Sequence, residues 1–182
     1  MSVESSLRNL QTEYLDVLLL HRPSPLMHAE IIAEAVYGLK KAGKIKRLGV
    51  SNFTISQMEL LQEVIPLEWN QIECSLTHYT PLFDGTLDHL QTKKIGAMAW
   101  SPLGSYFKAE SEQKNRIYKQ IHVLCDKYKC TEDQLFLAWL LQHPAKIYPV
   151  IGTTNPKRLS RSVAAEKINL EHTDWFLLTE AS

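Results

Sequence analysis

The sequence predicts an α/β fold built on a parallel sheet, and two observations point to it. Five short apolar runs alternate with segments whose apolar residues recur at helical spacing. The first run, residues 14–20, shows no alternation of apolar and polar residues and is stopped by Pro23. Such a run is typical of a strand whose two faces are both covered by helices. Strands and helices that alternate in this way build either a doubly wound sheet or part of a (β/α)8 barrel.

The strands are expected at the five apolar runs, and their ends favour the barrel. A doubly wound dinucleotide fold carries a G-x-G-x-x-G turn after its first strand, whereas the seven glycines here are scattered without that pattern. In a barrel, site residues come from the carboxyl ends of several strands. Each predicted strand ends on a polar group, so we expect these groups to share one mouth. The predicted strands are residues 14–20, 45–50, 67–74, 95–100 and 147–151.

Helices are expected in the intervals between these strands. A helix over residues 31–39 ends at Gly43, the usual residue after a helix terminus. Residues 54–57 and 131–134 are capping boxes that open two further helices. Asn155-Pro156 is typical of an N-cap followed by the first helical residue. The remaining predicted helices are residues 2–10, 86–94, 115–128 and 173–181.

The composition indicates one soluble globular domain over residues 1–182. Of the residues, 45% are apolar and 22% are charged, which is ordinary for a packed domain. Lys plus Arg and Asp plus Glu both total 20, so the charge is balanced and predicts neither nucleic acid nor an anionic membrane as partner. No apolar run approaches the roughly 20 residues that span a bilayer. We therefore expect small-molecule partners and no membrane.

The cysteines and histidines indicate a cytoplasmic protein without a metal site. Cys74, Cys125 and Cys130 contain no C-x-x-C pair, and no secretory apolar segment opens the chain. His122 and Cys125 lie three residues apart on a predicted helix, but no second ligand pair accompanies them. A reducing cytosol is the expected compartment.

Taken together, the strand ends resemble the aldo-keto reductase superfamily. The resemblance assigns the five strands to barrel strands four to eight and implies a partial (β/α)8 TIM barrel, truncated at its N-terminal side and slightly at its C-terminus. It also implies an oxidoreductase that reduces aldehydes or ketones by hydride transfer from a nicotinamide cofactor. The matching motifs are Leu20-His21-Arg22-Pro23, Gly49-Val50-Ser51-Asn52-Phe53, Asn70-Gln71-Ile72-Glu73, Ala99-Trp100-Ser101-Pro102-Leu103-Gly104, and Val150-Ile151-Gly152-Thr153-Thr154 with Arg158.

The resemblance implies a catalytic role for one residue, His21. It matches the family's histidine, which orients the carbonyl and donates a hydrogen bond to its oxygen. From the strand alone, a satisfied and partly buried histidine is an equal alternative. The family's aspartate, tyrosine and lysine precede this stretch and have no match here, so we expect no measurable carbonyl reduction from the chain as given. The alternative function is a non-catalytic nucleotide-binding or interaction module derived from an aldo-keto reductase.

The resemblance also implies a nicotinamide and pyrophosphate site. Ser51, Asn52 and Gln71 would hold the carboxamide, which needs both donors and acceptors. Trp100 would stack on the nicotinamide ring. The alternatives are an Asx-type turn for Asn52, strand-end solvation for Gln71 and barrel core for Trp100. The residues implied to border the pyrophosphate are Ser101, Leu103 and Gly104.

At the predicted helix start Asn155-Pro156, the resemblance implies an adenosine 2′-phosphate site. We expect Thr153 and Thr154 to lie where free backbone amides and the positive end of the helix dipole favour a phosphate. Arg158 falls one turn into the helix. These residues favour NADPH over NADH. One phosphate charge partner is absent, because this chain has Gly152 where many relatives carry a lysine.

Five of eight strands do not close a barrel. The strands at 14–20 and 147–151 are then each left with an unpaired edge, which predicts self-association of the chain.

Overall fold

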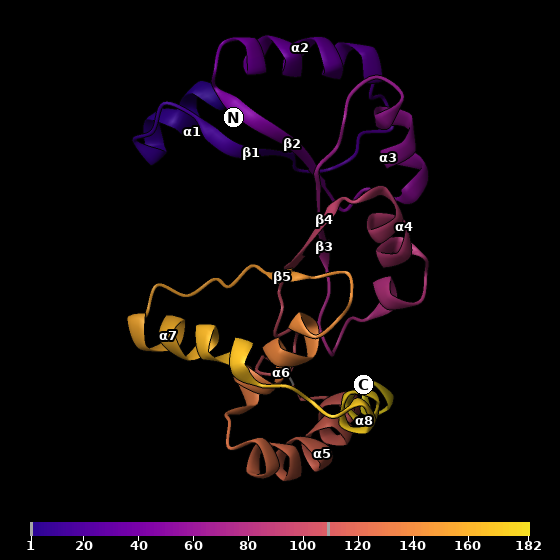
Figure 1. Cartoon of the computed structure of the whole chain (residues 1–182), viewed down its shortest axis with the longest axis vertical. Coiled ribbons are helices and arrows are strands. Elements are labelled where there is room, and N and C mark those ends of the chain that lie inside the picture. Colours follow the sequence, from indigo (N-terminus) through magenta and orange to yellow (C-terminus); the bar gives the residue numbers. More distant parts are fainter. Residues whose placement is uncertain (1, 109) are drawn as a thin grey trace. The chain divides into compact units, whose positions relative to one another are not determined.

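The computed structural model describes residues 2–108 and 110–182, and its strands form a parallel sheet (Figure 1). The sheet has five strands in the order β1-β2-β3-β4-β5. The pairings β1–β2, β2–β3 and β4–β5 are parallel, so the predicted parallel α/β fold is confirmed. The strands are β1 Leu15–Leu20, β2 Ile45–Ser51, β3 Trp69–Glu73, β4 Gly96–Trp100 and β5 Tyr148–Pro149.

The predicted helices all form, within a few residues of the expected bounds. The capping box at the start of α3 is present, because the Thr54 amide donates to Gln57 Oε1 at 3.0 Å and the Gln57 amide donates to Thr54 Oγ1 at 3.4 Å. The helices are α1 Val3–Leu10, α2 Ala29–Lys41, α3 Ile55–Gln62, α4 Thr86–Lys93, α5 Glu112–Tyr128, α6 Glu132–Leu141, α7 Pro156–Ala164 and α8 His172–Ala181, with 3-10 turns at η1 Thr80–Leu82 and η2 Ala165–Lys167.

The chain divides into two compact units, each with its own core. The first unit comprises residues 1–71 and 89–96. Its core lies between β2 and the helices after it, where Leu48, Val50, Met58 and Leu61 have no exposed surface. This burial fixes the register of β2, because a shift of one residue would turn its apolar side chains to the opposite face.

The first strand corrects one expectation about burial. Residues 14–20 were expected to be buried on both faces, but no residue of β1 is fully buried and Asp16 is exposed. Among the described strands β1 pairs only with β2. A strand that has a neighbour on just one edge buries less of each side chain. The apolar run therefore predicts the strand correctly, but the predicted burial on both faces is wrong.

The second unit comprises residues 72–88 and 97–182 and is centred on α6. The six consecutive residues from Leu135 to Leu140 are all buried. The Trp139 ring stacks on Trp175 with ring centroids 5.2 Å apart, and Trp139 Nε1 donates to Thr179 Oγ1 at 2.9 Å. A helix that is apolar on all sides must be covered by its neighbours, which here are α5, α7, η2 and β5, together with α8 through Trp175 and Thr179.

The last strand is shorter than expected. The predicted strand 147–151 is reduced to Tyr148–Pro149, which pairs with Met98 and Ala99 of β4. Neighbouring N–H groups of a strand point to opposite edges, so Pro149, which precedes the Val150 amide facing β4, lacks a donor only on the edge away from β4. The Val150 amide still donates to the Ala99 carbonyl at 2.8 Å, so the chain continues alongside β4 into the next loop.

Two further findings bear on partners. Among the described residues, no helix is both long and apolar enough to cross a membrane. Within the same residues, His, Cys, Asp and Glu side chains form no group of three or more that could hold a metal ion.

Candidate functional site

Three predicted site residues lie at one level of adjacent strands in the first unit: His21 follows β1, Ser51 ends β2, and Gln71 is the middle residue of β3. The register pairs Leu20 with Val50 and Ser51 with Gln71. His21 therefore follows β1 at the level where β2 reaches Ser51 and β3 reaches Gln71. This is the edge of a parallel sheet at which ligands bind in α/β barrels.

Hydrogen bonds join Ser51, Asn52 and Gln71 into one group. Ser51 Oγ donates to the Gln71 carbonyl at 3.1 Å, and the Asn52 amide donates to the same carbonyl at 2.9 Å. Asn52 Nδ2 donates to Ser51 Oγ at 3.1 Å. Asn52 has φ 56°, a left-handed conformation that asparagine adopts more readily than most residues. The backbone at the end of β2 thus turns sharply and holds the Asn52 side chain beside Ser51.

Two side chains of this unit remain available to a ligand. His21 is exposed and makes no hydrogen bond or ion pair within residues 2–108 and 110–182. The alternative of a satisfied, partly buried histidine is therefore wrong. The side-chain amide of Gln71 is partly exposed and likewise has no protein partner in the described part of the chain. An amide and an imidazole that are held at a strand end without partners can both donate to an oxygen of a ligand.

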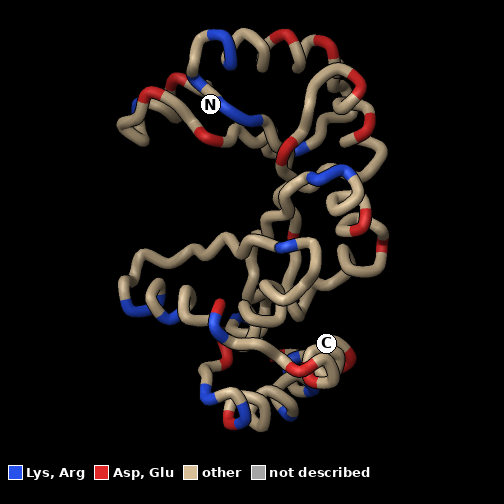
Figure 2. The backbone as a smooth tube through the Cα atoms, viewed as in Figure 1, with Lys and Arg blue, Asp and Glu red and all other residues tan. Residues whose placement is uncertain are grey.

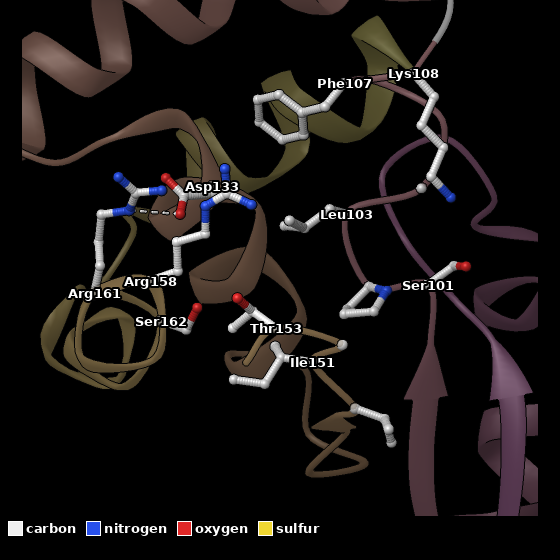
Figure 3. Close-up of a pocket in the computed structure, with 14 residues that line it drawn as sticks. Ser101, Leu103, Phe107, Lys108, Asp133, Ile151, Thr153, Arg158, Arg161 and Ser162 are labelled. Atoms are coloured by element: carbon white, nitrogen blue, oxygen red, sulfur yellow. Dashed lines mark hydrogen bonds and ion pairs between the residues drawn. The ribbon is translucent and has the colours of Figure 1, made fainter. Parts of the chain in front are cut away.

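The second unit contains a pocket of about 630 Å³ (Figure 3). This volume lies within the usual range for small-molecule sites. Its walls come from the loop after β4, the segment after β5, the start of α6 and the pocket-facing side of α7. Five of the predicted residues line it, whereas Trp100 and Thr154 do not. The lining comprises Ser101, Pro102, Leu103, Gly104, Phe107, Lys108, Asp133, Val150, Ile151, Gly152, Thr153, Arg158, Arg161 and Ser162.

The charges in this pocket favour an anion. The lining carries three cations, Lys108, Arg158 and Arg161, and one carboxylate, Asp133. Figure 2 shows the basic residues of α7, a helix that contains no acidic residue. The Arg161 Nε atom forms an ion pair with Asp133 Oδ2 at 2.7 Å. Arg158 makes no hydrogen bond through its guanidinium and no ion pair to any described residue, so its charge is free for a ligand.

The start of α7 differs from the expectation of free amides. Asn155 Oδ1 accepts hydrogen bonds from the Lys157 amide at 2.9 Å and the Arg158 amide at 3.3 Å. The Asn155 amide itself donates to Thr153 Oγ1 at 3.2 Å, and Pro156 has no N–H. The first turn is therefore already capped. The capped amides of this turn are therefore not available to an anion, and binding at α7 depends on side chains.

The loop after β4 is held in place by Thr77. Ser101 has φ 47° and Gly104 has φ 58°, and the Gly104 amide donates to the Ser101 carbonyl at 2.7 Å. Thr77 Oγ1 accepts from the Ser105 amide at 2.9 Å. A Cβ atom added at Gly104 would collide with Thr77 Oγ1 and lie 2.6 Å from Ser75 Oγ. Gly104 is therefore required by the packing of the loop, in addition to the role that the resemblance implies.

Nine lining residues were not assigned to the site from the sequence, and five of these lie outside the recognised motifs. Arg161 and Ser162 lie three and four residues after Arg158, so they share its helix face, and that spacing could have found them. Asp133 belongs to a capping box, which explains its residue type without any ligand. The other two missed residues are Phe107 and Lys108, which follow the recognised loop motif.

Comparison with known proteins agrees with these strand ends. The model of the Aldo/keto reductase family matches residues 1–182. The uncharacterized oxidoreductase YcsN of Bacillus subtilis is 40% identical over 185 residues, which cover 99% of this chain and 62% of that protein. A 6-dehydroglucose reductase of Agrobacterium fabrum is 39% identical, over 98% of this chain and 60% of that protein. The chain thus spans about three fifths of the length of these relatives.

Solved structures give the same result for the fold. An aldo/keto reductase from Klebsiella pneumoniae, solved in complex with NADP and acetate, superposes with a TM-score of 0.88 at 28% identity. The superposition covers 98% of this chain and 62% of that one. The thermostable aldo-keto reductase Tm1743 superposes with a TM-score of 0.89 at 26% identity, over 100% of this chain and 65% of that one. The predicted partial (β/α)8 barrel is confirmed, and the chain belongs to the aldo/keto reductase family.

Proposed function

We propose that this chain supplies the NADPH-binding residues and the carbonyl-orienting histidine of an aldo-keto reductase that reduces a small aldehyde or ketone. The observation that carries the proposal is the pocket beside α7, where Arg158 is unpaired and the lining has an excess of positive charge. A dinucleotide bearing an additional phosphate on its adenosine ribose is an anion of the kind this lining suits. When it is bound, the reduced nicotinamide supplies the hydride.

Arg158 is the residue to which we assign the adenosine 2′-phosphate. Its guanidinium has donors arranged as a fork, which matches two oxygens of a phosphate. The Thr153 hydroxyl lies in the same lining and adds a donor. Because the amides of the first turn of α7 are capped by Asn155, recognition depends on these side chains. NADH lacks the 2′-phosphate, so we expect the chain to bind NADPH more tightly.

The nicotinamide end is assigned to residues of the first unit and to Trp100. The Gln71 side chain is without a protein partner among the described residues, and Asn52 is held beside it by Ser51. The Gln71 amide offers both donors and an acceptor to a carboxamide. His21 would donate a hydrogen bond to the substrate oxygen, on which negative charge develops as the hydride arrives. Ser101, Leu103 and Gly104 would border the pyrophosphate.

The proton that completes the reduction is not supplied by a residue we can assign in this chain. The family's tyrosine, lysine and aspartate have no match among its 182 residues. General acid catalysis contributes roughly a hundredfold to ten-thousandfold. We therefore expect the purified chain to bind NADPH without measurable carbonyl reduction. NADPH oxidation by the chain, measured at 340 nm with an aldehyde and abolished by His21→Ala, would contradict this expectation.

Calorimetric titration of the purified chain with NADPH and NADH tests the binding proposal. Arg158→Ala is expected to weaken NADPH binding about ten- to a hundredfold, as for loss of a hydrogen bond to a charged group. NADH binding is expected to change little. Lys157→Ala is the matched control, because it removes an equal charge from the neighbouring position of α7 that does not line the pocket. Equal losses for the two cofactors, or equal losses in the two variants, would overturn the assignment of Arg158.

We also infer that the chain associates with itself and acts in the cytoplasm. Among the described strands β1 has a single partner, β2, and its apolar side chains are only partly buried. An exposed edge of this kind is a template for pairing with another chain. Size-exclusion chromatography with light scattering is expected to show dimers or larger species, and a monodisperse monomer would contradict the inference.

A further inference from the structure

Arg161 is held in the pocket by a single carboxylate. Its Nε atom, and not its terminal nitrogens, contacts Asp133 Oδ2 at 2.7 Å (Figure 3). Within the described residues the two terminal nitrogens have no partner. The backbone carbonyl of Arg161 accepts from Gln134 Nε2 at 3.0 Å, so α6 fixes this residue through its backbone as well. The side chain is therefore oriented while most of its donors stay unused.

Asp133 is itself fixed before it meets the arginine. It is the second residue of α6, where the helix dipole favours a negative charge. The Thr131 hydroxyl donates to Asp133 Oδ1 at 2.7 Å, which leaves Oδ2 for Arg161. The Asp133 side chain is 15% exposed, whereas the Arg161 side chain is 45% exposed, so the carboxylate is shielded and the guanidinium stays accessible.

The Asp133 carboxylate could affect a bound anion in two opposite ways. If Asp133 faced the phosphate directly, it would repel the phosphate. If Asp133 acts through Arg161, it contacts the Nε edge of the guanidinium and leaves the terminal nitrogens for the ligand. Arg158 lies one turn earlier on the same side of α7, and both arginines line the pocket. Two guanidinium groups at this spacing suit one phosphate that carries up to two charges.

We propose that Asp133 is a positioning residue that orients Arg161, so that Arg161 joins Arg158 in binding the adenosine 2′-phosphate and sets the preference for NADPH. This inference rests on the proposed function and adds two residues to it. Arg161 contacts the cofactor, whereas Asp133 acts only through Arg161.

The experiment uses probes that carry the adenosine end alone. Adenosine 2′,5′-bisphosphate and adenosine 5′-monophosphate are titrated into the wild-type chain and its variants by calorimetry at low and high salt. Arg161→Gln is expected to weaken the bisphosphate about ten- to a hundredfold and to reduce the salt dependence of its binding. Asp133→Asn is expected to weaken it several-fold, because the arginine loses its charged anchor. The monophosphate is expected to change less than twofold in both variants.

Thr131→Val is the variant that loosens Asp133 without altering any charge in the pocket. It is expected to weaken the bisphosphate in the same direction as Asp133→Asn and by a smaller factor. Thermal melts of each variant measure folding separately. Tighter bisphosphate binding by Asp133→Asn would overturn the inference, since the carboxylate would then only repel the ligand.

Three further results would also overturn the inference. Weaker monophosphate binding by Asp133→Asn would mean that the carboxylate contacts the ribose hydroxyl directly. If the wild-type chain binds the bisphosphate and the Arg161→Gln and Asp133→Asn variants bind it with the same affinity, this inference is overturned and the proposed function still stands. Failure of the wild-type chain to bind NADPH and the bisphosphate would overturn the proposed function together with this inference.

Discussion

Replacing Gly104 by alanine tests how firmly the pocket loop is held on Thr77. Gly104 has φ 58°, and an L residue in the left-handed region costs about 1–2 kcal/mol. The added Cβ collides with Thr77 Oγ1 and lies 2.6 Å from Ser75 Oγ, so the loop must shift or the threonine must rotate. Rotation breaks the bond from the Ser105 amide, worth about 0.5–1.5 kcal/mol, and unrelieved overpacking costs about 1–3 kcal/mol. We expect a total loss of about 2–5 kcal/mol of unfolding free energy, measured by urea denaturation and tryptophan fluorescence.

Two other glycines provide matched controls for Gly104→Ala. Gly43 has φ 69° with no atom within 4 Å of an added Cβ, so Gly43→Ala carries the backbone cost alone, about 1–2 kcal/mol. Gly152 lines the same pocket, has open space and needs no left-handed conformation, so Gly152→Ala is expected to be neutral within about 0.5 kcal/mol. Gly104→Ala should also weaken NADPH and NADH equally, because it moves the loop assigned to the pyrophosphate. A loss no larger than that of Gly43→Ala, with unchanged cofactor affinity, would refute the argument that Thr77 fixes the loop.

Three further predictions concern the pocket, the core and the pH dependence. Gly152→Lys is expected to raise the affinity for NADPH several-fold more than the affinity for NADH, as measured by calorimetry. The open space at Gly152 accepts a side chain, and the lysine adds a cation to the pocket that Arg158 lines. Thr179→Val leaves Trp139 Nε1 without its acceptor in the core and is expected to cost about 1–3 kcal/mol in urea unfolding, with Thr179→Ser as the rescue. Burial lowers the pKa of His143, although Asp88 opposes this effect, so the unfolded chain binds more protons as the pH falls below the usual histidine pKa. The contribution of His143 to the unfolding free energy is therefore expected to be complete above about pH 6.5 and to decrease as the pH drops through that value. The His143→Gln variant should lack this part of the decrease.

The strand ends could be predicted because two sequence signals indicate each of them. An apolar run indicates the strand, and the polar motif that follows indicates its carboxyl end. His21 and Ser51 were placed on neighbouring strands by this reasoning, and the register of β1 and β2 puts them at one level. The burial of β1 could not be predicted in the same way, because an apolar run does not reveal how many neighbours its strand has. The same limit applies to β5, where the apolar pattern predicted a longer strand than the one that pairs with β4.

The electrostatics of the pocket were only half predictable. Arg158 follows from a motif, and Arg161 from its spacing on the same helix. Asp133 is distant in sequence and carries a residue type that its capping box already explains, so only the fold shows that it meets Arg161. The sequence predicts that Asn155 caps the first turn of α7, but the pattern does not show which backbone amides this capping occupies. Once one asparagine oxygen accepts from two amides, those amides are no longer donors for a ligand.

The helix that carries both arginines contributes little to the core. No residue of α7 is buried, and its apolar residues Leu159 and Val163 are 47% and 56% exposed. The buried residue Ala165 anchors the chain only after the helix has ended. Substitutions on α7 therefore carry a small folding cost, in contrast to substitutions at the buried residues 135–140 of α6. Selection on cofactor charge can act on α7 almost independently of selection for a stable fold, so the choice between the two nicotinamide cofactors can change during evolution through a few surface substitutions.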